Sequence, residues 1–454
     1  MKTNTLLLSI LILLFGASLS AQDITGQWSG TLELPTYKLR LVFHIESGDK
    51  GFTATMDSPD QGAKGIPATQ VTFEPPVLIL EIAAAQIKYK GTLEGEQIKG
   101  TFTQNGYSIP LNLMKSTGTI QVNRPQEPAP PYLYRSEEVT FENKKAGVTL
   151  AGTLTLPQTG SNFPVAVLIT GSGKQNRDEE ILGHKPFLII SDYLTRNGIA
   201  VLRYDDRGMP PSTGDFESAT SADFAEDVAS AIEYLKTRKE INRKKIGLIG
   251  HSEGGMIAPM VASASKDVNF IVLLAGPGIK CDELMLLQKR LIEEKMGLNQ
   301  MQVEASQQLI KGAYQIITNS TSNGASLRDS VANYLKGSLS KEQLQSFSEQ
   351  ITTPWFTYFL RFAPAVYLSK VKCPVLALNG SKDLQVAPKE NLAGIKVHVE
   401  KGGNKQVTTL ELENLNHLFQ ECTTGLPTEY GTIEQTCSPR MLEALKDWIV
   451  NTVK

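Results

Sequence analysis

This sequence has few cysteines and histidines and almost no net charge. Its 454 residues include only 4 cysteines and 5 histidines, and 45 basic residues against 47 acidic ones leave a formal net charge of −2. A nearly neutral chain gives no electrostatic reason to expect nucleic acid or an anionic membrane surface as a partner. The scattered histidines and cysteines form no zinc-type motif, and the sequence has no phosphate-binding P-loop. We therefore expect no metal, no cofactor and no nucleic-acid partner.

Long apolar runs are also missing, except at the start of the chain. Lys2 precedes the apolar stretch Leu6–Phe15, and small residues follow it up to Ala21. This order predicts a secretory signal peptide over residues 1–21, because the apolar stretch is shorter than the about 20 residues that a membrane span needs. We expect no stable membrane span after cleavage, and a secreted or periplasmic protein. The exact cleavage site and the oligomeric state stay open.

Export would allow the cysteines to form disulfides. The four cysteines, Cys281, Cys373, Cys422 and Cys437, permit three connectivities. We favour a Cys422–Cys437 bridge, because these two residues bracket the loop just after His417. Cys281 and Cys373 either pair with each other or remain as buried thiols.

Residues 22–122 have the texture of an all-β domain. Four segments read as strands: Leu39–Ile45, where apolar and polar residues alternate, Val77–Ile82, Tyr89–Leu93 and Ile98–Phe102. Asn105-Gly106 is a typical hairpin turn between two strands. We predict a small antiparallel barrel or sandwich with an accessory role, either structural or in substrate positioning. A ligand-binding role for this domain is the alternative.

A proline-rich linker over residues 123–135 separates this domain from the catalytic domain, which we place at residues 136–454. In the catalytic domain strands alternate with helices, and this order predicts an α/β fold with a mostly parallel sheet covered by helices on both faces. The expected strands, of which the first two form an antiparallel pair, are Glu138–Phe141, Val148–Leu156, Val165–Ile169, Ile199–Tyr204, Ile246–Ile249, Phe270–Leu274, Pro374–Gly380 and Thr408–Glu413. One helix is expected near Pro186–Arg196, and another follows the capping-box-like start Thr220–Asp223.

The alternation stops at about Cys281 and resumes at about Lys372. The interval holds four helix-like segments, Leu284–Lys295, Val303–Ile317, Leu327–Leu335 and Gln343–Phe362. They predict a helical cap at about residues 281–366, which would exclude water and shape the substrate pocket. The aromatic residues Trp355, Phe356, Tyr358 and Phe359 either line that pocket or form the core of the cap, and we favour the core.

The most informative motif is Gly250-His251-Ser252-Glu253-Gly254. It follows the apolar run Ile246–Ile249 and precedes small residues that can open a helix. A strand, a sharp turn and a helix with serine at the tip form the nucleophile elbow of α/β-hydrolases. Gly250 and Gly254 lack the Cβ atoms that would collide in so tight a turn. The motif predicts Ser252 as the nucleophile of an acyl transfer to water, provided that a general base activates it.

Partners for this serine follow in the order that α/β-hydrolases use, acid and then histidine. Asp383 lies on the turn after the strand Pro374–Gly380, at the carboxyl end where open α/β sheets place their sites. His417 lies in a loop, whereas His398 lies within the strand-like segment Ile395–Val399. We predict His417 as the general base and then acid, and Asp383 as the group that orients its imidazole.

An oxyanion hole requires two N–H donors, one of them from the loop after an earlier strand. Thr170-Gly171-Ser172-Gly173 follows such a strand, and its glycines allow the backbone to turn its N–H groups inward. We predict the backbone N–H groups of Ser172 and Glu253 as the two donors.

Several stretches beyond the elbow point to a family. They are Thr170–Gly173, Asn176–Glu179, Arg203–Gly208, Gly250–Gly255, Pro354–Phe356, Asn379–Val386 and Asn416-His417. With them, the chain from about residue 136 onward resembles secreted bacterial α/β-hydrolases of the esterase and serine-aminopeptidase-like group. The resemblance implies hydrolysis of short-chain carboxylic esters, a small-molecule ester as substrate, and the triad Ser252, Asp383 and His417.

One stretch departs from that family. Where its members have a second glycine shortly after Asp-Arg-Gly, this chain continues as Gly208-Met209-Pro210-Pro211-Ser212. Proline fixes φ and removes an N–H group, so the loop is stiffer. We expect Arg207 to be a structural ion-pair partner of Asp205 or Asp206.

Two other functions stay open. An aminopeptidase or dipeptidase would need carboxylates to hold the α-ammonium group of its substrate, and Asp178, Glu179 and Glu180 are candidates. We favour a solvated loop with Arg177 as local partner for these three. A binding protein with an idle hydrolase site is the third hypothesis, and an intact triad argues against it.

Overall fold

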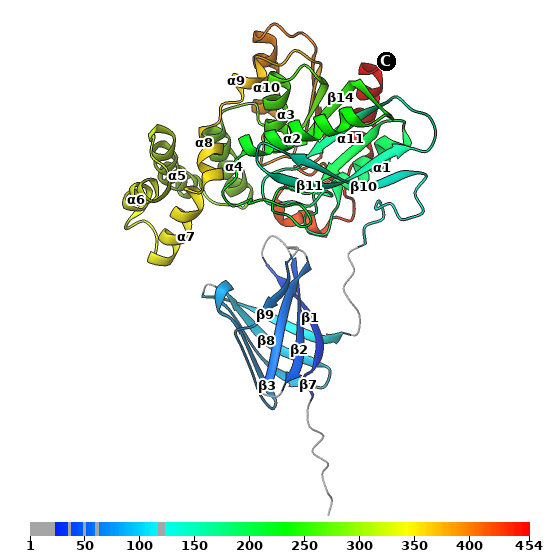
Figure 1. Cartoon of the computed structure of the whole chain (residues 1–454). Helices are drawn as coiled ribbons and strands as arrows, with labels where there is room; N and C mark the ends of the chain where they lie inside the picture. The colour runs from blue at the N-terminus through cyan, green and yellow to red at the C-terminus, as the bar shows by residue number, and fades with distance from the viewer. Residues whose placement is uncertain (1–22, 35–37, 49–50, 60–62, 105, 117–122) are drawn as a thin grey trace, which may run out of the picture. The chain divides into compact units, whose positions relative to one another are not determined.

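The computed structural model describes residues 23–34, 38–48, 51–59, 63–104, 106–116 and 123–454 (Figure 1). The predicted signal peptide at residues 1–21 lies outside the described residues. The chain divides into two compact units near Thr119–Ile120. Among the described residues, no helix combines the length and apolar character that crossing a membrane requires.

The first unit is a single antiparallel sheet, which has nine strands in the described residues (Figure 1). The strands are β1 Gly26–Glu33, β2 Lys38–Gly48, β3 Gly51–Ser58, β4 Ala63–Pro67, β5 Gln70–Glu74, β6 Val77–Ile82, β7 Ile87–Glu94, β8 Gln97–Gln104 and β9 Tyr107–Ser116, in the spatial order β4-β3-β2-β1-β9-β8-β7-β6-β5. The sheet curls until β3 and β5, which are far apart in this order, come together, and Phe52 of β3 packs edge-to-face on Phe73 of β5 with 6.0 Å between ring centroids. The predicted small antiparallel domain is therefore a half-barrel and not a sandwich.

Side chains from alternate positions along the strands fill the inside of this half-barrel. Trp28, Phe43 and Tyr89 are buried there, and Phe43 stacks on Tyr89. The Tyr89 hydroxyl donates to the carbonyl oxygen of Ile98 at 3.1 Å. Strands β7 and β8, both expected from the sequence, pair antiparallel. Strands β8 and β9 also pair, although Asn105 of the predicted turn lies outside the described residues.

The second unit contains a sheet of eight strands in its described part (Figure 1). They are β10 Tyr134–Asn143, β11 Val148–Pro157, β12 Phe163–Ile169, β13 Ala200–Tyr204, β14 Ile241–His251, β15 Val268–Leu274, β16 Val375–Gly380 and β17 Val407–Leu412, in the order β10-β11-β13-β12-β14-β15-β16-β17. Strands β10, β11 and β13 pair antiparallel, and all pairs from β13 to β17 are parallel. The prediction of a mostly parallel sheet with a leading antiparallel pair is confirmed.

Helices cover both faces of this sheet, as predicted. One face packs against α2 Ser221–Thr237, α3 Gly254–Ala264 and α10 Pro388–Lys401. The other face packs against α1 Pro186–Arg196 and α11 Pro439–Thr452. Helix α2 begins as expected, because the Asp223 carboxylate accepts from the Thr220 backbone N–H at 2.9 Å and completes a capping box.

The predicted strand Ile395–Val399 is wrong, since these residues lie in α10. The β-branched residues suggested a strand, but Leu392, Ile395 and Val399 are spaced for one face of a helix and are buried against the sheet. His398 is on the outer side of that helix, half-exposed. Packing on the sheet decides the structure here, and local propensity does not.

The chain between β15 and β16 forms the predicted cap. Its helices are α4 Cys281–Lys295, α5 Gln300–Asn319, α6 Gly324–Leu335, α7 Lys341–Ile351, α8 Pro354–Arg361 and the short α9 Ala365–Leu368. Figure 1 shows α5, α6 and α7 grouped beside the sheet, with α4 and α8 between them and the sheet. The segment Gln343–Phe362, which we expected to be one helix, is two. Pro354 starts α8, and the Thr353 hydroxyl accepts from the Phe356 N–H at 3.2 Å.

All four cysteines lie in the described residues as free thiols, so the favoured Cys422–Cys437 bridge is not formed. The two sulfur atoms have different surroundings. Cys437 is buried, with Sγ near the carbonyl oxygen of Pro186, whereas Cys422 directs Sγ to the carbonyl oxygen of Asn414 at 3.4 Å. Proximity in the sequence did not bring the two side chains together.

Candidate active site

The turn between β14 and α3 has the geometry of a nucleophile elbow. Ser252, at its tip, has φ of +52°, a left-handed conformation that non-glycine residues rarely adopt. A Cβ on Gly250 would lie 2.0 Å from the carbonyl oxygen of Gly254, and a Cβ on Gly254 would lie 2.1 Å from that of Ile169. Both positions therefore require glycine, as the motif indicated. The turn presents Ser252 to a cavity of about 230 Å³.

His417 and Asp383 meet at the same edge of the sheet. Asp383 follows β16, and its Oδ1 atom accepts from the backbone N–H groups of Gln385 at 2.8 Å and Val386 at 2.9 Å. Its Oδ2 atom lies 2.8 Å from Nδ1 of His417, in the loop after β17 (residues 413–421, the His417 loop). Because the carboxylate accepts at Oδ2, Nδ1 of His417 carries a proton and Nε2 is left with a lone pair. No hydrogen bond joins Ser252 Oγ to His417 within the described residues, but both line the same cavity.

The loop after β12 (residues 170–175, the Ser172 loop) passes directly beside the serine. A Cβ on Gly171 would lie 3.3 Å from the Cβ atom of Ser252. Ser172 and Glu253 both line the cavity, and their backbone N–H groups have no acceptor among the described residues. The structure thus brings four of the five predicted site residues, Ser172, Ser252, Glu253 and His417, to one cavity, and Asp383 contacts His417 from outside its lining.

Two buried carboxylates hold the Ser172 loop. Asp206 accepts from the Thr170 hydroxyl at 2.8 Å and from the Gln175 backbone N–H at 2.8 Å. Glu179 accepts from the Gly171 N–H at 2.6 Å. Both residues lie in stretches that carried the family resemblance, but their partners at the site could not be read from the sequence.

Arg207 does not pair with either of the aspartates we expected. Its guanidinium lies 2.7 Å from the carboxylate of Asp227 on α2, and Arg177 takes Asp205 instead at 2.7 Å. The expectation of a structural ion pair for Arg207 is right, but the partner is wrong, because α2 packs across the loop and supplies a buried carboxylate. Arg177 also pairs with Glu138, so it is not a local partner of the acids that follow it.

The three consecutive acids after Arg177 do not form a cluster. Asp178 pairs closely with Arg203, and Glu180 accepts from Asn176 at 3.2 Å. Glu179 is buried and lines the serine cavity, where its carboxylate is already taken by the Gly171 N–H and by His251. Asp178 and Glu180 do not line the serine cavity. These contacts give no group of carboxylates arranged around a substrate ammonium.

Glu253 connects the elbow to the cap. Its carboxylate accepts from the Ser221 hydroxyl at 2.5 Å and from Nε1 of Trp355 on α8 at 2.8 Å. Burial raises the pKa of Glu253, although hydrogen bonds from Ser221, Trp355 and Ser172 oppose the rise. Because Trp355 belongs to the cap, this contact fixes α8 to the residue that carries one of the free N–H groups.

The cap aromatics divide between the two roles we considered. Trp355 and Phe359 line the serine cavity, with Leu284, Met285 and Gln288 of α4 opposite the sheet residues. Phe356 belongs to the core of the cap. Core packing is therefore confirmed for Phe356. Trp355 and Phe359 combine both roles, because they also pack in apolar clusters. Tyr358 packs against an apolar cluster and is not in the lining of the serine cavity.

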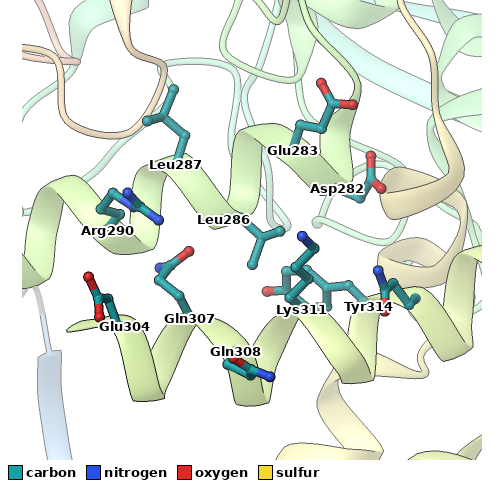
Figure 2. Close-up of a pocket in the computed structure, with 11 residues that line it drawn as sticks. Asp282, Glu283, Leu286, Leu287, Arg290, Glu304, Gln307, Gln308, Lys311 and Tyr314 are labelled. Atoms are coloured by element: carbon teal, nitrogen blue, oxygen red, sulfur yellow. The ribbon is translucent and has the colours of Figure 1, made fainter. Parts of the chain in front are cut away.

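A second cavity, of about 710 Å³, lies in the cap between α4 and α5 (Figure 2). Charged and amide side chains surround it, among them Asp282, Arg290, Gln307 and Lys311, as Figure 2 shows. It shares no lining residue with the serine cavity. The lining described for it contains neither a histidine nor a serine or cysteine, so it offers no nucleophile or base of the predicted kind.

The fold and this site define an α/β-hydrolase: a serine on a strand-to-helix elbow, with a hydrogen-bonded aspartate and histidine after later strands of a mostly parallel sheet. Within that class, the chain belongs to the S15 family. The family model, described as X-Pro dipeptidyl-peptidase (S15 family), matches residues 146–418.

The chain is also similar to individual proteins, at identities below 30% in the three cases that follow. The chain is similar to Esterase EstD of Thermotoga maritima, with 28% identity over 318 residues, which are 68% of this chain and 68% of EstD. Among solved structures it is similar to Est1E of Butyrivibrio proteoclasticus, at 16% identity and a TM-score of 0.44, covering 69% of this chain and 99% of Est1E. It is also similar to the Pyrococcus furiosus esterase Pf2001, at 17% identity and a TM-score of 0.44, covering 74% of this chain and 98% of Pf2001.

Because the Asp206 carboxyl holds the Ser172 loop, its titration should make the stability of the folded protein depend on pH. Burial, together with the charges of Glu253 and Glu179, raises the pKa of Asp206 from 3.8 to about 8. Its contribution to stability is complete below pH 3.8 and is lost as the pH rises through about 8, because the unfolded chain gives up the proton first. Asp206→Asn stays neutral and can still bond Thr170 and Gln175. Urea unfolding at pH 5, 7 and 9 should show Asp206→Asn gaining stability relative to the wild type as the pH rises.

Asp215→Asn is the matched control, because Asp215 is exposed and hydrogen bonds lower its pKa. Its difference from the wild type should not grow between pH 5 and 9. A constant difference for Asp206→Asn over the same range would contradict the assignment of a raised pKa to Asp206.

Proposed function

We propose that the protein hydrolyses small carboxylic esters through an acyl-enzyme intermediate. Ser252 is the nucleophile, His417 is the general base and then acid, and Asp383 orients the imidazole. The observation that supports this most is the 2.8 Å contact between Asp383 and Nδ1 of His417, which leaves Nε2 with a lone pair in the cavity that Ser252 lines.

The reaction follows from these positions. Nε2 of His417 accepts the Ser252 proton as Oγ attacks the ester carbonyl, and the imidazolium that forms is stabilised by Asp383. The oxyanion is bound by the backbone N–H groups of Ser172 and Glu253, which have no acceptor among the described residues. His417 then protonates the leaving alcohol, and the same steps with water release the acid and restore Ser252.

Three observations favour a small, neutral ester as substrate. The cavity measures about 230 Å³, and its cap side is mostly apolar, with Gln288 as the polar exception among Leu284, Met285, Trp355 and Phe359. Within the described lining there is no lysine or arginine to pair with a substrate carboxylate. The relative EstD is an esterase by name, and it is similar to this chain over 68% of its length.

The second candidate is a serine peptidase that acts on small peptides. The description of the S15 family model as X-Pro dipeptidyl-peptidase favours it. Against it stand the contacts of Asp178 with Arg203 and of Glu179 with Gly171 and His251, which occupy the carboxylates that a substrate ammonium would need. We therefore place it second.

We also propose that the protein is exported, to the periplasm or the medium. The support is the sequence order of Lys2, the apolar stretch Leu6–Phe15 and the small residues up to Ala21. N-terminal sequencing of the mature protein from an expressing bacterium should give a start near residue 22. A mature protein that begins at Met1 would contradict export by a cleaved signal.

Ser252→Ala tests the reaction itself. Loss of the nucleophile should lower kcat for p-nitrophenyl acetate and butyrate by about 10⁶-fold, the size of the effect in other serine triads. The wild type should hydrolyse these esters and leave amino-acyl anilides intact. Ser263→Ala is the control, because Ser263 lies on the same helix α3 and its hydroxyl bonds only the carbonyl of Met260. Anilide turnover without ester turnover would favour the peptidase, and activity in Ser252→Ala would refute the mechanism.

Phe359→Ala tests whether the cap limits the acyl chain. Removing this ring from the cavity should raise the ratio of kcat/KM for hexanoate over acetate esters by about 10-fold, the effect of a methylene or more in an apolar pocket. Phe362→Ala is a close match, since both rings are 6% exposed and belong to the same apolar cluster, but Phe362 does not line the serine cavity.

Both phenylalanine variants should lose about 3–5 kcal/mol of stability, because each leaves a cavity in the cap. Only Phe359→Ala should change the chain-length preference. The same change in both variants would show that cap stability, and not the shape of the serine cavity, sets the preference.

A further inference from the structure

A second acid–imidazole pair lies beside the proposed triad. Nδ1 of His251 is 2.9 Å from Oε1 of Glu179, and Nε2 of His251 is 3.0 Å from the main-chain oxygen of His417. The same Oε1 atom accepts from the Gly171 N–H at 2.6 Å. One pair of side chains therefore joins the Ser172 loop, the elbow and the His417 loop.

This arrangement separates the roles of the two histidines near Ser252. The rings of His251 and His417 are 4.8 Å apart between centroids, so both are close enough to be considered as the base. Both nitrogens of His251 face acceptors, Glu179 and a carbonyl oxygen, and a carbonyl can only accept. His251 therefore has no lone pair available for the Ser252 proton, whereas Nε2 of His417 does.

We propose that Glu179 and His251 are positioning residues, which hold the Ser172 N–H donor and the His417 loop in a fixed relation to Ser252. This inference rests on the proposed function, because it assigns the pair a role in the same reaction. Glu179 takes the Gly171 N–H, and the next N–H along the chain, that of Ser172, is the one left without an acceptor among the described residues. His251 fixes the backbone that carries the general base.

Burial and backbone strain support a functional role for the pair. Glu179 is 3% exposed and His251 is 7% exposed. Glu179 also has φ of +51°, a strained conformation for a non-glycine residue that tends to cluster at active sites. A Cβ on Gly171 would lie 3.2 Å from Oε1 of Glu179, so a larger residue there would require the carboxylate to shift by a few tenths of an ångström.

The surroundings of His251 favour its protonated form. Burial by itself would lower the pKa of His251, but the charge of Glu179 and the hydrogen bonds to Glu179 and to the His417 carbonyl outweigh it. Asp383 adds a further raising effect, and the pKa of His251 lies above its usual value. An imidazolium that donates from both nitrogens matches the two acceptors that face it.

Glu179→Gln is the test, because glutamine keeps the size and the oxygen that accepts from Gly171 but removes the charge. We expect kcat for p-nitrophenyl acetate to fall roughly 10- to 100-fold, somewhat less than the about 10²–10³-fold cost of losing an oxyanion donor outright. KM should stay within about twofold, because the positioned groups act in the transition state and not in ground-state binding. The rate of Ser252 labelling by an organophosphonate should fall in parallel.

A double-mutant cycle shows whether the two residues act as one unit. If they do, Glu179→Gln combined with His251→Gln should cost little more in kcat than the more damaging single change. Asp227→Asn is the matched control, since Asp227 is also a buried carboxylate paired with a cation, Arg207, and it does not line the serine cavity. It should lower the melting temperature and leave kcat within about twofold.

The outcomes separate this inference from the proposed function. If Glu179→Gln retains kcat within about twofold of wild type, or changes only KM, while Ser252→Ala is inactive, the positioning role is wrong and the ester hydrolase stands. If the wild type does not turn over esters, or if Ser252→Ala does, the proposed function itself fails, whatever Glu179→Gln shows.

Discussion

The close contact between Gly254 and the carbonyl of Ile169 is the constraint on which the rest of the site depends. With a Cβ atom at Gly254 only 2.1 Å from that oxygen, helix α3 could not begin beside the end of β12. Because the Ser172 loop leaves β12 at this point, the contact that shapes the elbow also brings that loop to Ser252. The N–H groups of Ser172 and Glu253 thereby reach one cavity, where the carboxylates of Glu179 and Asp206 hold the Ser172 loop in place.

Buried acids surround this contact, and their hydration is lost on folding. Asp206, Glu179 and Glu253 are each held by N–H or O–H donors, and of these three only Glu179 has a cationic partner, His251, in the described residues. Such burial costs stability and is typical of functional sites. The raised pKa of Asp206, about 8, keeps that carboxyl neutral at pH 7. One negative charge that would oppose an oxyanion beside the Ser172 loop is thereby removed.

The sequence predicted those features whose physical cause is local. The elbow was recognisable because Gly250 and Gly254 are required by its backbone, and Asp383 and His417 were placed by the order of strands and loops. Local patterns failed where packing between distant segments decides the structure. In α10, β-branched residues that suggested a strand lie within a helix, and Arg207 pairs with Asp227 on another element. Glu179 appeared to be one of three surface acids, because its contacts with Gly171 and with His251, 72 residues further on, exist only in the folded chain.

The cap is one continuous insertion between β15 and β16, and only part of it reaches the serine cavity. Its outer helices α5, α6 and α7 contribute no lining residue there, so their length and composition can drift without altering the strands that place the reacting groups. That freedom ends at Trp355, whose indole bonds the carboxylate of Glu253. Substitutions in the cap could therefore change which esters enter the cavity, as long as Trp355, or another donor in its place, still binds the Glu253 carboxylate. The residues that select the substrate and those that break the bond can therefore change separately, apart from the contacts that join them, such as Trp355 with Glu253 and Gln288 with Gln385.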